Sequence, residues 1–317
     1  MSKGPGRLRV RLQSIRYAAR DIHLFELAKA EGGTLPPAAP GAHIDLHLGN
    51  GLVRSYSLVN AGTAPDCYVI GIKHDAAGRG GSRWAHQQWR VGSELDISAP
   101  RNNFPLDEQA PHTVLFAGGV GIMPIWCMAQ RLRAIGASWE LWYAARSRAE
   151  AAFMHELLES SGHVRMHYDD EAGRIFDIAA AVAAAPAQAH LYCCGPTAML
   201  DAFEAAAIGR APETVHLERF AAKEASATTG GFLVHLARSG QELAVPPGAS
   251  VLEVLQAHGV HLDVSCQEGI CGSCEVAVID GEVDHRDSVL TKAQQASNKM
   301  MMVCCSGAHS ARLVLDL

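Results

Sequence analysis

The sequence predicts a chain of three domains of different classes: an antiparallel β-barrel, an α/β domain with a parallel sheet, and a small β-rich domain that carries cysteines. Its 317 residues are enough for two to three domains of the usual ~100–200 residues each. The first third consists of short alternating segments, the middle alternates strand and helix patterns, and three cysteines fall within nine residues near the end. These three observations set the predicted order of the domains.

The composition excludes several classes of protein. The net charge is −6, from 27 basic and 33 acidic residues, which does not suggest a nucleic-acid binder. No run of about 18 uncharged apolar residues exists, and the Ala-rich stretch near residue 180 is interrupted by Pro186. Arginines alternate with apolar residues at the start, which indicates a first strand and not a signal peptide. We therefore expect a cytoplasmic protein that binds neither nucleic acid nor membrane.

The barrel is predicted over residues 1–105, where strand-like segments alternate with turn residues. The segment "RSYSLVN" places Arg54, Tyr56 and Ser57 on one strand. Arg54 could bind a phosphate, Tyr56 could stack on a flat ring, and Ser57 could hydrogen-bond the edge of that ring. Taken singly, Arg54 and Tyr56 each have a structural alternative, namely a surface arginine and a half-buried strand tyrosine.

A second barrel segment, "IKHDAAGRGGSRW", has the composition of a phosphate-binding turn. Gly80, Gly81 and Ser82 could form a nest of backbone N–H groups, and Lys73 and Arg79 would add positive charge. The alternative is a flexible surface turn.

The α/β domain is predicted over residues 106–222. An apolar strand at 113–116 leads into the glycines of 118–121 and then into a helix, an arrangement that lets a pyrophosphate approach the helix N-terminus. The pattern is not the G-x-G-x-x-G fingerprint, so a purely structural turn is an equal alternative for this motif alone. The alternating βα series that follows favours a parallel sheet. Residues 194–196, "CGP", lie at the end of a strand before a helix that we expect Thr197 to cap, where ligands bind in open α/β sheets.

The cysteine pattern near the end is C-x4-C-x2-C, followed by one more cysteine after 29 intervening residues. This is the plant-type spacing for a [2Fe–2S] cluster, with Gly269 and Gly272 allowing the loop to curl. A zinc site is the alternative, but zinc sites usually use paired C-x2-C knuckles, and only one such pair is present. Cys305 competes with its neighbour for the last position, and on an extended strand only one of the two would face the cluster. The predicted metal ligands are Cys266, Cys271, Cys274 and Cys304.

The last domain, residues 232–317, resembles a plant-type ferredoxin, a β-grasp sheet crossed by one helix with Val251, Leu252, Val254 and Leu255 facing inward. Residues 223–231 form a predicted linker of small residues, and we expect it to be flexible.

Taken in order, R-x-Y-S, G-R-G-G-S, G-G-V-G-I-x-P, C-G-P and C-x4-C-x2-C…C resemble the phthalate dioxygenase reductase family of iron–sulfur flavoproteins over essentially the whole chain. The resemblance implies a ferredoxin reductase-like nucleotide domain, FMN, NADH and a [2Fe–2S] cluster as cofactors, and hydride transfer from NADH to FMN. Single electrons then pass through the cluster to a terminal oxygenase, which we expect to be of the Rieske type. The family also favours a monomer.

The resemblance also assigns residues. For FMN it implies Arg54, Tyr56, Ser57, Lys73, Gly80, Gly81 and Ser82. For the nicotinamide cofactor it implies Gly119, Gly121, Cys194, Gly195 and Pro196. Where the two rings meet, it implies Glu218 and Phe220, with Phe220 as a flap beside the flavin or, alternatively, a core aromatic. The predicted catalytic residues are Ser57, Cys194, Glu218 and Phe220.

Several alternatives remain open from the sequence. Arg146, Ser147 and Arg148 follow the second α/β strand and could bind the 2′-phosphate of NADPH, although the family favours NADH. A P450 or another monooxygenase could replace the Rieske-type partner. A stand-alone flavin or ferric reductase would not need the ferredoxin domain, and a simple iron–sulfur carrier would not need the other two.

Overall fold

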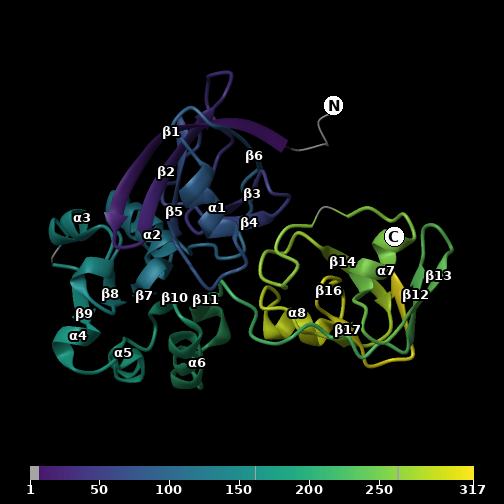
Figure 1. The fold of residues 1–317 in the computed structure, drawn as a ribbon. Helices are drawn as coiled ribbons and strands as arrows, with labels where there is room; N and C mark the ends of the chain where they lie inside the picture. Colours follow the sequence, from purple (N-terminus) through teal and green to yellow (C-terminus); the bar gives the residue numbers. More distant parts are fainter. Residues whose placement is uncertain (1–6, 161, 263) are drawn as a thin grey trace. The chain divides into compact units, whose positions relative to one another are not determined.

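The structure of the protein is a computed structural model, and it describes residues 7–160, 162–262 and 264–317. The chain divides into two compact units, Met1–Glu218 and Arg219–Leu317 (Figure 1). No helix in the described ranges is long and apolar enough to cross a membrane.

The first unit begins with the antiparallel barrel. Its strands form one sheet in the order β4-β3-β6-β1-β2-β5, and a bridge between Leu58 and Ile70 joins the two edges. Alternate side chains such as Phe25, Ile44 and Tyr68 fill the interior, as the period-2 pattern requires. The elements are β1 (Arg7–Ala19), β2 (Ile22–Lys29), β3 (His43–His47), β4 (Val53–Ser57), β5 (Cys67–Lys73), α1 (Gly81–Gln88) and β6 (Glu94–Ser98).

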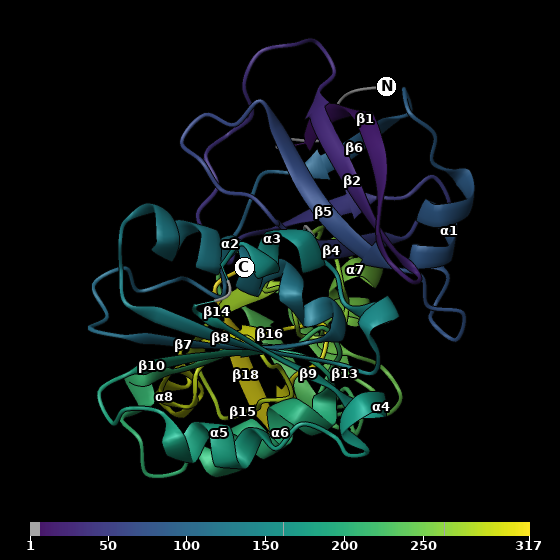
Figure 2. The same cartoon turned by 90° about the vertical axis from the view of Figure 1, so that its left-hand side faces the viewer.

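The α/β sheet follows in the same unit, with five parallel strands in the order β11-β10-β7-β8-β9. All residues of the central strand β7 are buried, because helices cover both faces of the sheet. Figure 2 shows α2 and α3 on one face and α5 and α6 on the other. The strands are β7 (Thr113–Gly118), β8 (Trp139–Ala145), β9 (Val164–Tyr168), β10 (His190–Cys194) and β11 (Val215–Glu218). The helices are η1 (Gly119–Gly121), α2 (Ile122–Ala134), η2 (Arg148–Glu150), α3 (Met154–Leu158), α4 (Asp169–Ala172), α5 (Ile178–Ala184), α6 (Thr197–Ala206) and η3 (Pro212–Thr214).

The second unit contains a mixed five-stranded sheet in the order β13-β12-β18-β14-β16 and a two-stranded sheet of β15 and β17. Helix α7 starts with a capping box between Ser250 and Glu253 and packs its apolar face on the core, as predicted. The elements are β12 (Phe232–Leu236), β13 (Glu242–Val245), α7 (Val251–Ala257), β14 (Glu275–Asp280), β15 (Val283–Asp284), α8 (Lys292–Ser297), β16 (Met300–Met302), β17 (Gly307–Ala308) and β18 (Arg312–Leu315). This is the predicted β-grasp arrangement of a mixed sheet crossed by one helix.

The predicted linker, residues 223–231, contains neither helix nor strand. Its second half is nevertheless tied to the second unit, because Ala227 donates its backbone N–H to Cys305 at 2.7 Å and Thr228 accepts one from Gly248 at 2.8 Å. Glu224 also forms an ion pair with Arg286 at 3.0 Å. Flexibility of the whole segment stays a prediction, with these contacts against it.

Candidate active site and cluster loop

Two turns meet at the carboxyl ends of β7 and β10. A Cβ atom on Gly121 would lie 2.1 Å from the Cys194 carbonyl oxygen, and one on Gly118 would lie 2.6 Å from Cδ of Pro196. Side chains at these glycines would therefore force the turns apart. Gly119 instead has a φ of +53° and faces open space. The packed turns leave a backbone surface that a phosphate can approach at the start of α2.

The "CGP" turn differs in one detail from the prediction. Helix α6 begins at Thr197, but its N-cap residue is Pro196 in extended conformation, and no side chain caps the helix. The expectation that Thr197 caps the helix was wrong by one position, because proline already supplies the φ that the residue before the first helical turn needs. Cys194 is fully buried, and burial raises the pKa of its thiol well above the usual range. It is a neutral thiol.

A hydrogen bond connects the barrel with the edge of the parallel sheet. Ser57, the last residue of β4, donates its Oγ–H to Oε2 of Glu218 at 3.1 Å, across 161 residues of sequence. Glu218 is the last residue of β11 and lies in register with Cys194 on β10. The three predicted residues Ser57, Cys194 and Glu218 are therefore brought together at one strand edge.

The carboxyl group in this cluster has an altered acidity. Burial raises the pKa of Glu218 to about 8, and the hydrogen bond from Ser57 opposes that shift. Near neutral pH the carboxyl is mostly protonated, so it can act as a donor as well as an acceptor. The cluster carries hydroxyl, thiol and carboxyl groups with little net charge.

The barrel also brings together the predicted phosphate-binding residues. A Cβ on Gly81 would lie 2.8 Å from Cγ of Arg54, so the arginine packs directly over the first residue of α1. Gly80 has a φ of +91° and is the N-cap residue of that helix, while Ser82 Oγ accepts the backbone N–H of Asp75 at 3.0 Å. A guanidinium beside a glycine-rich helix N-terminus is an arrangement that can bind a phosphate group.

Two other predicted flavin residues have partners within the protein. Tyr56 packs against the barrel core, and burial raises its pKa to about 12, so the phenol is neutral. Lys73 Nζ lies 3.3 Å from the carboxylate of Glu150, so its charge is shared with the α/β domain. Phe220 belongs to the second unit and is 42% exposed. Its position beside a flavin stays a prediction.

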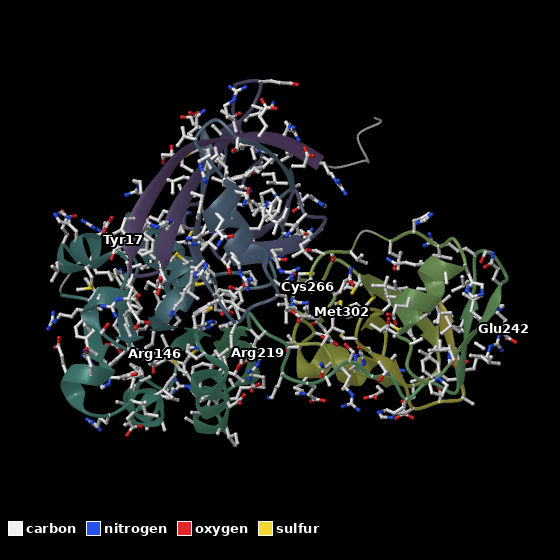
Figure 3. The ribbon with its side chains drawn as sticks, viewed as in Figure 1. Tyr17, Arg146, Arg219, Glu242, Cys266 and Met302 are labelled. Atoms are coloured by element: carbon white, nitrogen blue, oxygen red, sulfur yellow. The ribbon has the colours of Figure 1, made fainter. Side chains whose placement is uncertain are left out.

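The four predicted cluster cysteines are each at most 5% exposed. The Cys266 thiol interacts with that of Cys271, and the Cys304 thiol interacts with those of both Cys274 and Cys305. Backbone N–H groups point at sulfur, since Glu268 donates to Cys266 Sγ at 3.3 Å and Cys266 donates to Cys271 Sγ at 3.5 Å. Backbone amides directed at cysteine sulfur, together with the C-x4-C-x2-C…C spacing, suit a [2Fe–2S] cluster. Figure 3 labels Cys266 in the second unit.

Whether Cys304 or Cys305 is the fourth cluster ligand depends on the conformation of a turn, because neither residue lies on a strand. Strand β16 ends at Met302, so Cys304 and Cys305 lie in the turn that follows. The prediction that the fourth ligand comes from an extended strand was therefore wrong. Cys305 Sγ faces the Met302 carbonyl at 3.7 Å, and it would lie 2.4 Å from a Cβ on Gly269. Cys305 packs against the loop at Gly269, whereas Cys304 contacts the thiol of Cys274 as well as that of Cys305, so Cys304 stays the predicted fourth ligand.

A contact that the sequence analysis missed lies at the ends of β8 and β9. Arg148 forms two hydrogen bonds with the carboxylate of Glu171, at 2.5 Å and 2.9 Å. The signal was available in principle, because opposite charges follow two strands that a parallel sheet places side by side.

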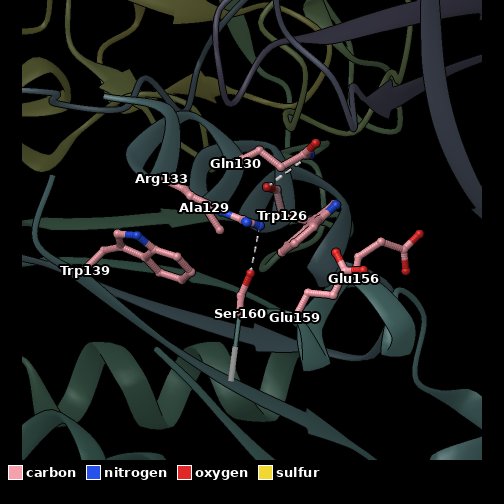
Figure 4. Close-up of a pocket in the computed structure, with 8 residues that line it drawn as sticks. All are labelled: Trp126, Ala129, Gln130, Arg133, Trp139, Glu156, Glu159 and Ser160. Carbon is pink, nitrogen blue, oxygen red and sulfur yellow. Dashed lines mark hydrogen bonds between the residues drawn. The ribbon is translucent and has the colours of Figure 1, made fainter. Parts of the chain in front are cut away.

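A separate cavity of about 180 Å³ lies between α2, the start of β8 and α3 (Figure 4). Arg133 donates to Ser160 Oγ across it at 3.3 Å. Because Trp139 is the first residue of β8, this cavity is at the amino ends of the strands, away from the glycine turns.

Comparison with known proteins agrees with this geometry. The model of the 2Fe–2S iron–sulfur cluster binding domain matches residues 234–309. The chain is 51% identical to the phenoxybenzoate dioxygenase subunit beta of Ectopseudomonas oleovorans, covering 97% of each chain. It is 40% identical to the solved structure of a phthalate dioxygenase reductase, described as modular for electron transfer from pyridine nucleotides to [2Fe–2S], with a TM-score of 0.72 and 98% of each chain covered.

The chain belongs to the phthalate dioxygenase reductase family. It is therefore an oxidoreductase, the reductase component of an oxygenase system, with flavin and iron–sulfur domains. The predicted fold class is confirmed for this family member. A self-sufficient cytochrome P450 monooxygenase of known structure also matches, with a TM-score of 0.91 and 36% identity over all of this chain. The chain spans 43% of that longer protein.

Proposed function

We propose that this protein takes a hydride from NADH onto FMN and delivers single electrons through a [2Fe–2S] cluster to a terminal oxygenase of the Rieske type. The observation that carries the proposal is the Ser57–Glu218 hydrogen bond, at 3.1 Å. It holds the flavin-binding barrel against the strand ends where a nicotinamide would arrive. A chain that only carried electrons through its cluster would not need this junction.

FMN would be held by residues of the barrel. Arg54 and the N-terminus of α1, with Gly80, Gly81 and Ser82, would bind its phosphate. Tyr56 would lie along the flavin ring, and Lys73 would add charge nearby. When bound, flavin accepts electrons as a pair and releases them one at a time.

The nicotinamide cofactor would lie along the carboxyl ends of the sheet. Gly119 and Gly121 would bring its pyrophosphate to the start of α2, and Gly195 and Pro196 would shape the adjacent turn. Cys194 would exclude water, because it is buried and neutral.

Ser57 and Glu218 would orient the reacting rings. A mostly protonated carboxyl accepts and donates hydrogen bonds without placing a full negative charge beside an electron-rich ring. Phe220 would be the flap beside the flavin. The part of the protein in this step is positioning, because hydride transfer needs no protein base.

The cluster would be held by Cys266, Cys271, Cys274 and Cys304, all of which are buried. We also propose that the protein acts as a monomer in the cytoplasm, where pyridine nucleotides and reduced thiols are available.

An anaerobic absorption titration with NADH, repeated with NADPH, tests the proposal. We expect bleaching of both a flavin band and a broad iron–sulfur band at low NADH, with a much weaker response to NADPH. Chromatography of the heat-released flavin should give FMN, and iron assays should give two irons per chain. Bleaching of flavin alone would contradict the iron–sulfur cluster, and release of FAD would contradict FMN as the flavin.

A cytochrome P450 is the second candidate acceptor, because a self-sufficient P450 monooxygenase contains a part similar to this whole chain. Electron delivery to a purified Rieske oxygenase, compared with delivery to a P450, separates the two. Faster reduction of the P450 would favour this second candidate.

A further inference from the structure

The order of the strands determines where the two ends of the nucleotide lie. Glu218 and Cys194 end β11 and β10, and the glycine turn follows β7, the next strand in the sheet. If the nicotinamide sits at β10 and β11 and the pyrophosphate at β7, the adenosine must extend over β8 and β9. This step rests on the proposed function. Neighbouring strands are about 4.8 Å apart, so β8 and β9 are within reach of an extended dinucleotide.

The residues that follow β8 and β9 are charged. Arg146 and Arg148 come after β8, and Asp169, Asp170 and Glu171 come after β9. The two segments are in contact, since Asp170 donates its backbone N–H to the Arg146 carbonyl at 3.1 Å. Three acidic and two basic side chains give this edge a net negative charge. Arg146 is labelled in Figure 3.

Of these two arginines, Arg148 is bound by another side chain of the protein. Its Nε and Nη2 donate to both oxygens of Glu171, at 2.5 Å and 2.9 Å, in a bidentate pair. Its guanidinium carbon also lies 4.5 Å from the centre of the Tyr168 ring. The pair lowers the pKa of Glu171 below its usual value, so this carboxyl is charged at neutral pH. A carboxylate thus occupies the fork that would otherwise bind a phosphate.

We propose that Glu171 is a specificity-determining residue that disfavours binding of the 2′-phosphate of NADPH by holding Arg148. A 2′-hydroxyl needs no cation at this edge, whereas a phosphate needs one and meets carboxylates instead. Glu171 is a positioning residue in this proposal, because it acts on the nucleotide through the arginine.

The exposure of the pair limits its strength. The side chains are 64% and 49% exposed for Arg148 and Glu171. Exposed ion pairs are weak and are screened by salt, so NADPH is disfavoured and not excluded completely. The contribution of Glu171 should therefore be largest at low ionic strength.

The test compares NADH and NADPH on the holoprotein. In Glu171→Gln, Arg148 is released and one negative charge is lost. We expect kcat/KM for NADPH to rise about fivefold while that for NADH stays the same. The Kd of 2′,5′-ADP, measured by calorimetry on the oxidised protein, should fall by a similar factor, whereas the Kd of 5′-AMP should not change. The effect should shrink at high salt.

Two further variants separate the effect of the Arg148–Glu171 pair from a general change of charge. The double variant Arg148→Gln with Glu171→Gln should lose the gain, because no fork remains to bind the phosphate. Glu213→Gln removes an equal charge before β11 and should change neither nucleotide. An unchanged NADPH response in Glu171→Gln, or a gain that persists in the double variant, would overturn the role of the pair. Loss of the NADH response in unmodified protein would instead contradict the proposed function.

Discussion

Replacing Glu218 by glutamine should change how the stability of the first unit depends on pH. The structure raises the pKa of this carboxyl from 4.5 to about 8 by burial. Glutamine has nearly the same shape and can still accept the hydrogen bond from Ser57, but it cannot titrate. The substitution therefore removes the effect of proton binding on stability while leaving the packing of the side chain nearly unchanged.

The sign follows from proton binding in the folded and unfolded states. Between pH 4.5 and about 8 the folded state binds a proton at Glu218 that the unfolded state has lost. The free energy of unfolding must then fall as pH rises through this window. Each pKa unit corresponds to about 1.4 kcal/mol, so the full shift gives at most about 5 kcal/mol. The residue keeps part of its surface exposed, so we expect about half of that.

Tryptophan fluorescence in urea can measure this effect. All five tryptophans, Trp84, Trp89, Trp126, Trp139 and Trp142, lie in the first unit, so the signal does not report the ferredoxin domain. The stability of wild type relative to Glu218→Gln should decrease between pH 5 and pH 8 by about 2 kcal/mol. Glu213→Gln, at an exposed position, serves as the control. A difference between wild type and Glu218→Gln that is the same at both pH values would refute the reasoning.

Three further predictions concern the cofactor sites. Cys304→Ser should lose the iron–sulfur absorption while Cys305→Ser keeps it, as spectra and iron assays will show; equal loss in both would contradict the assignment. Gly81→Ala should weaken FMN binding about tenfold in an equilibrium titration, because its methyl group displaces the arginine above it. Gly121→Ala should raise KM for NADH at least about tenfold with FMN retained. Gly162→Ala, where a Cβ meets no atom within 4 Å, is the matched control for both glycines.

The sequence predicted best what depends on local spacing. The cysteine loop, the glycine turn after β7 and the apolar face of α7 each lie within one segment, where residue type and local geometry are directly linked. The three classes of domain follow from the same local periodicities.

Pairs far apart in sequence were harder to predict. The family resemblance named Ser57 and Glu218, but no local rule predicts a hydrogen bond across 161 residues. The Arg148–Glu171 pair depends on the register of β8 and β9, and the position of Cys305 depends on where β16 ends. Local patterns fix the elements, whereas these contacts are fixed by how the elements pack.

The separation of the cluster ligands along the chain has a consequence for how the protein is made. Three ligands lie on the loop from Cys266 to Cys274, and the fourth comes 30 residues later, after β14, β15, α8 and β16 have been synthesised. Complete coordination of the cluster therefore requires that residues up to Cys304 have left the ribosome. The cluster then links the cysteine loop to the turn after β16. Binding energy at such a site is folding energy. Cells short of iron should consequently accumulate less of this protein, because its unliganded second unit, Arg219–Leu317, is degraded by proteases even when its messenger RNA is abundant.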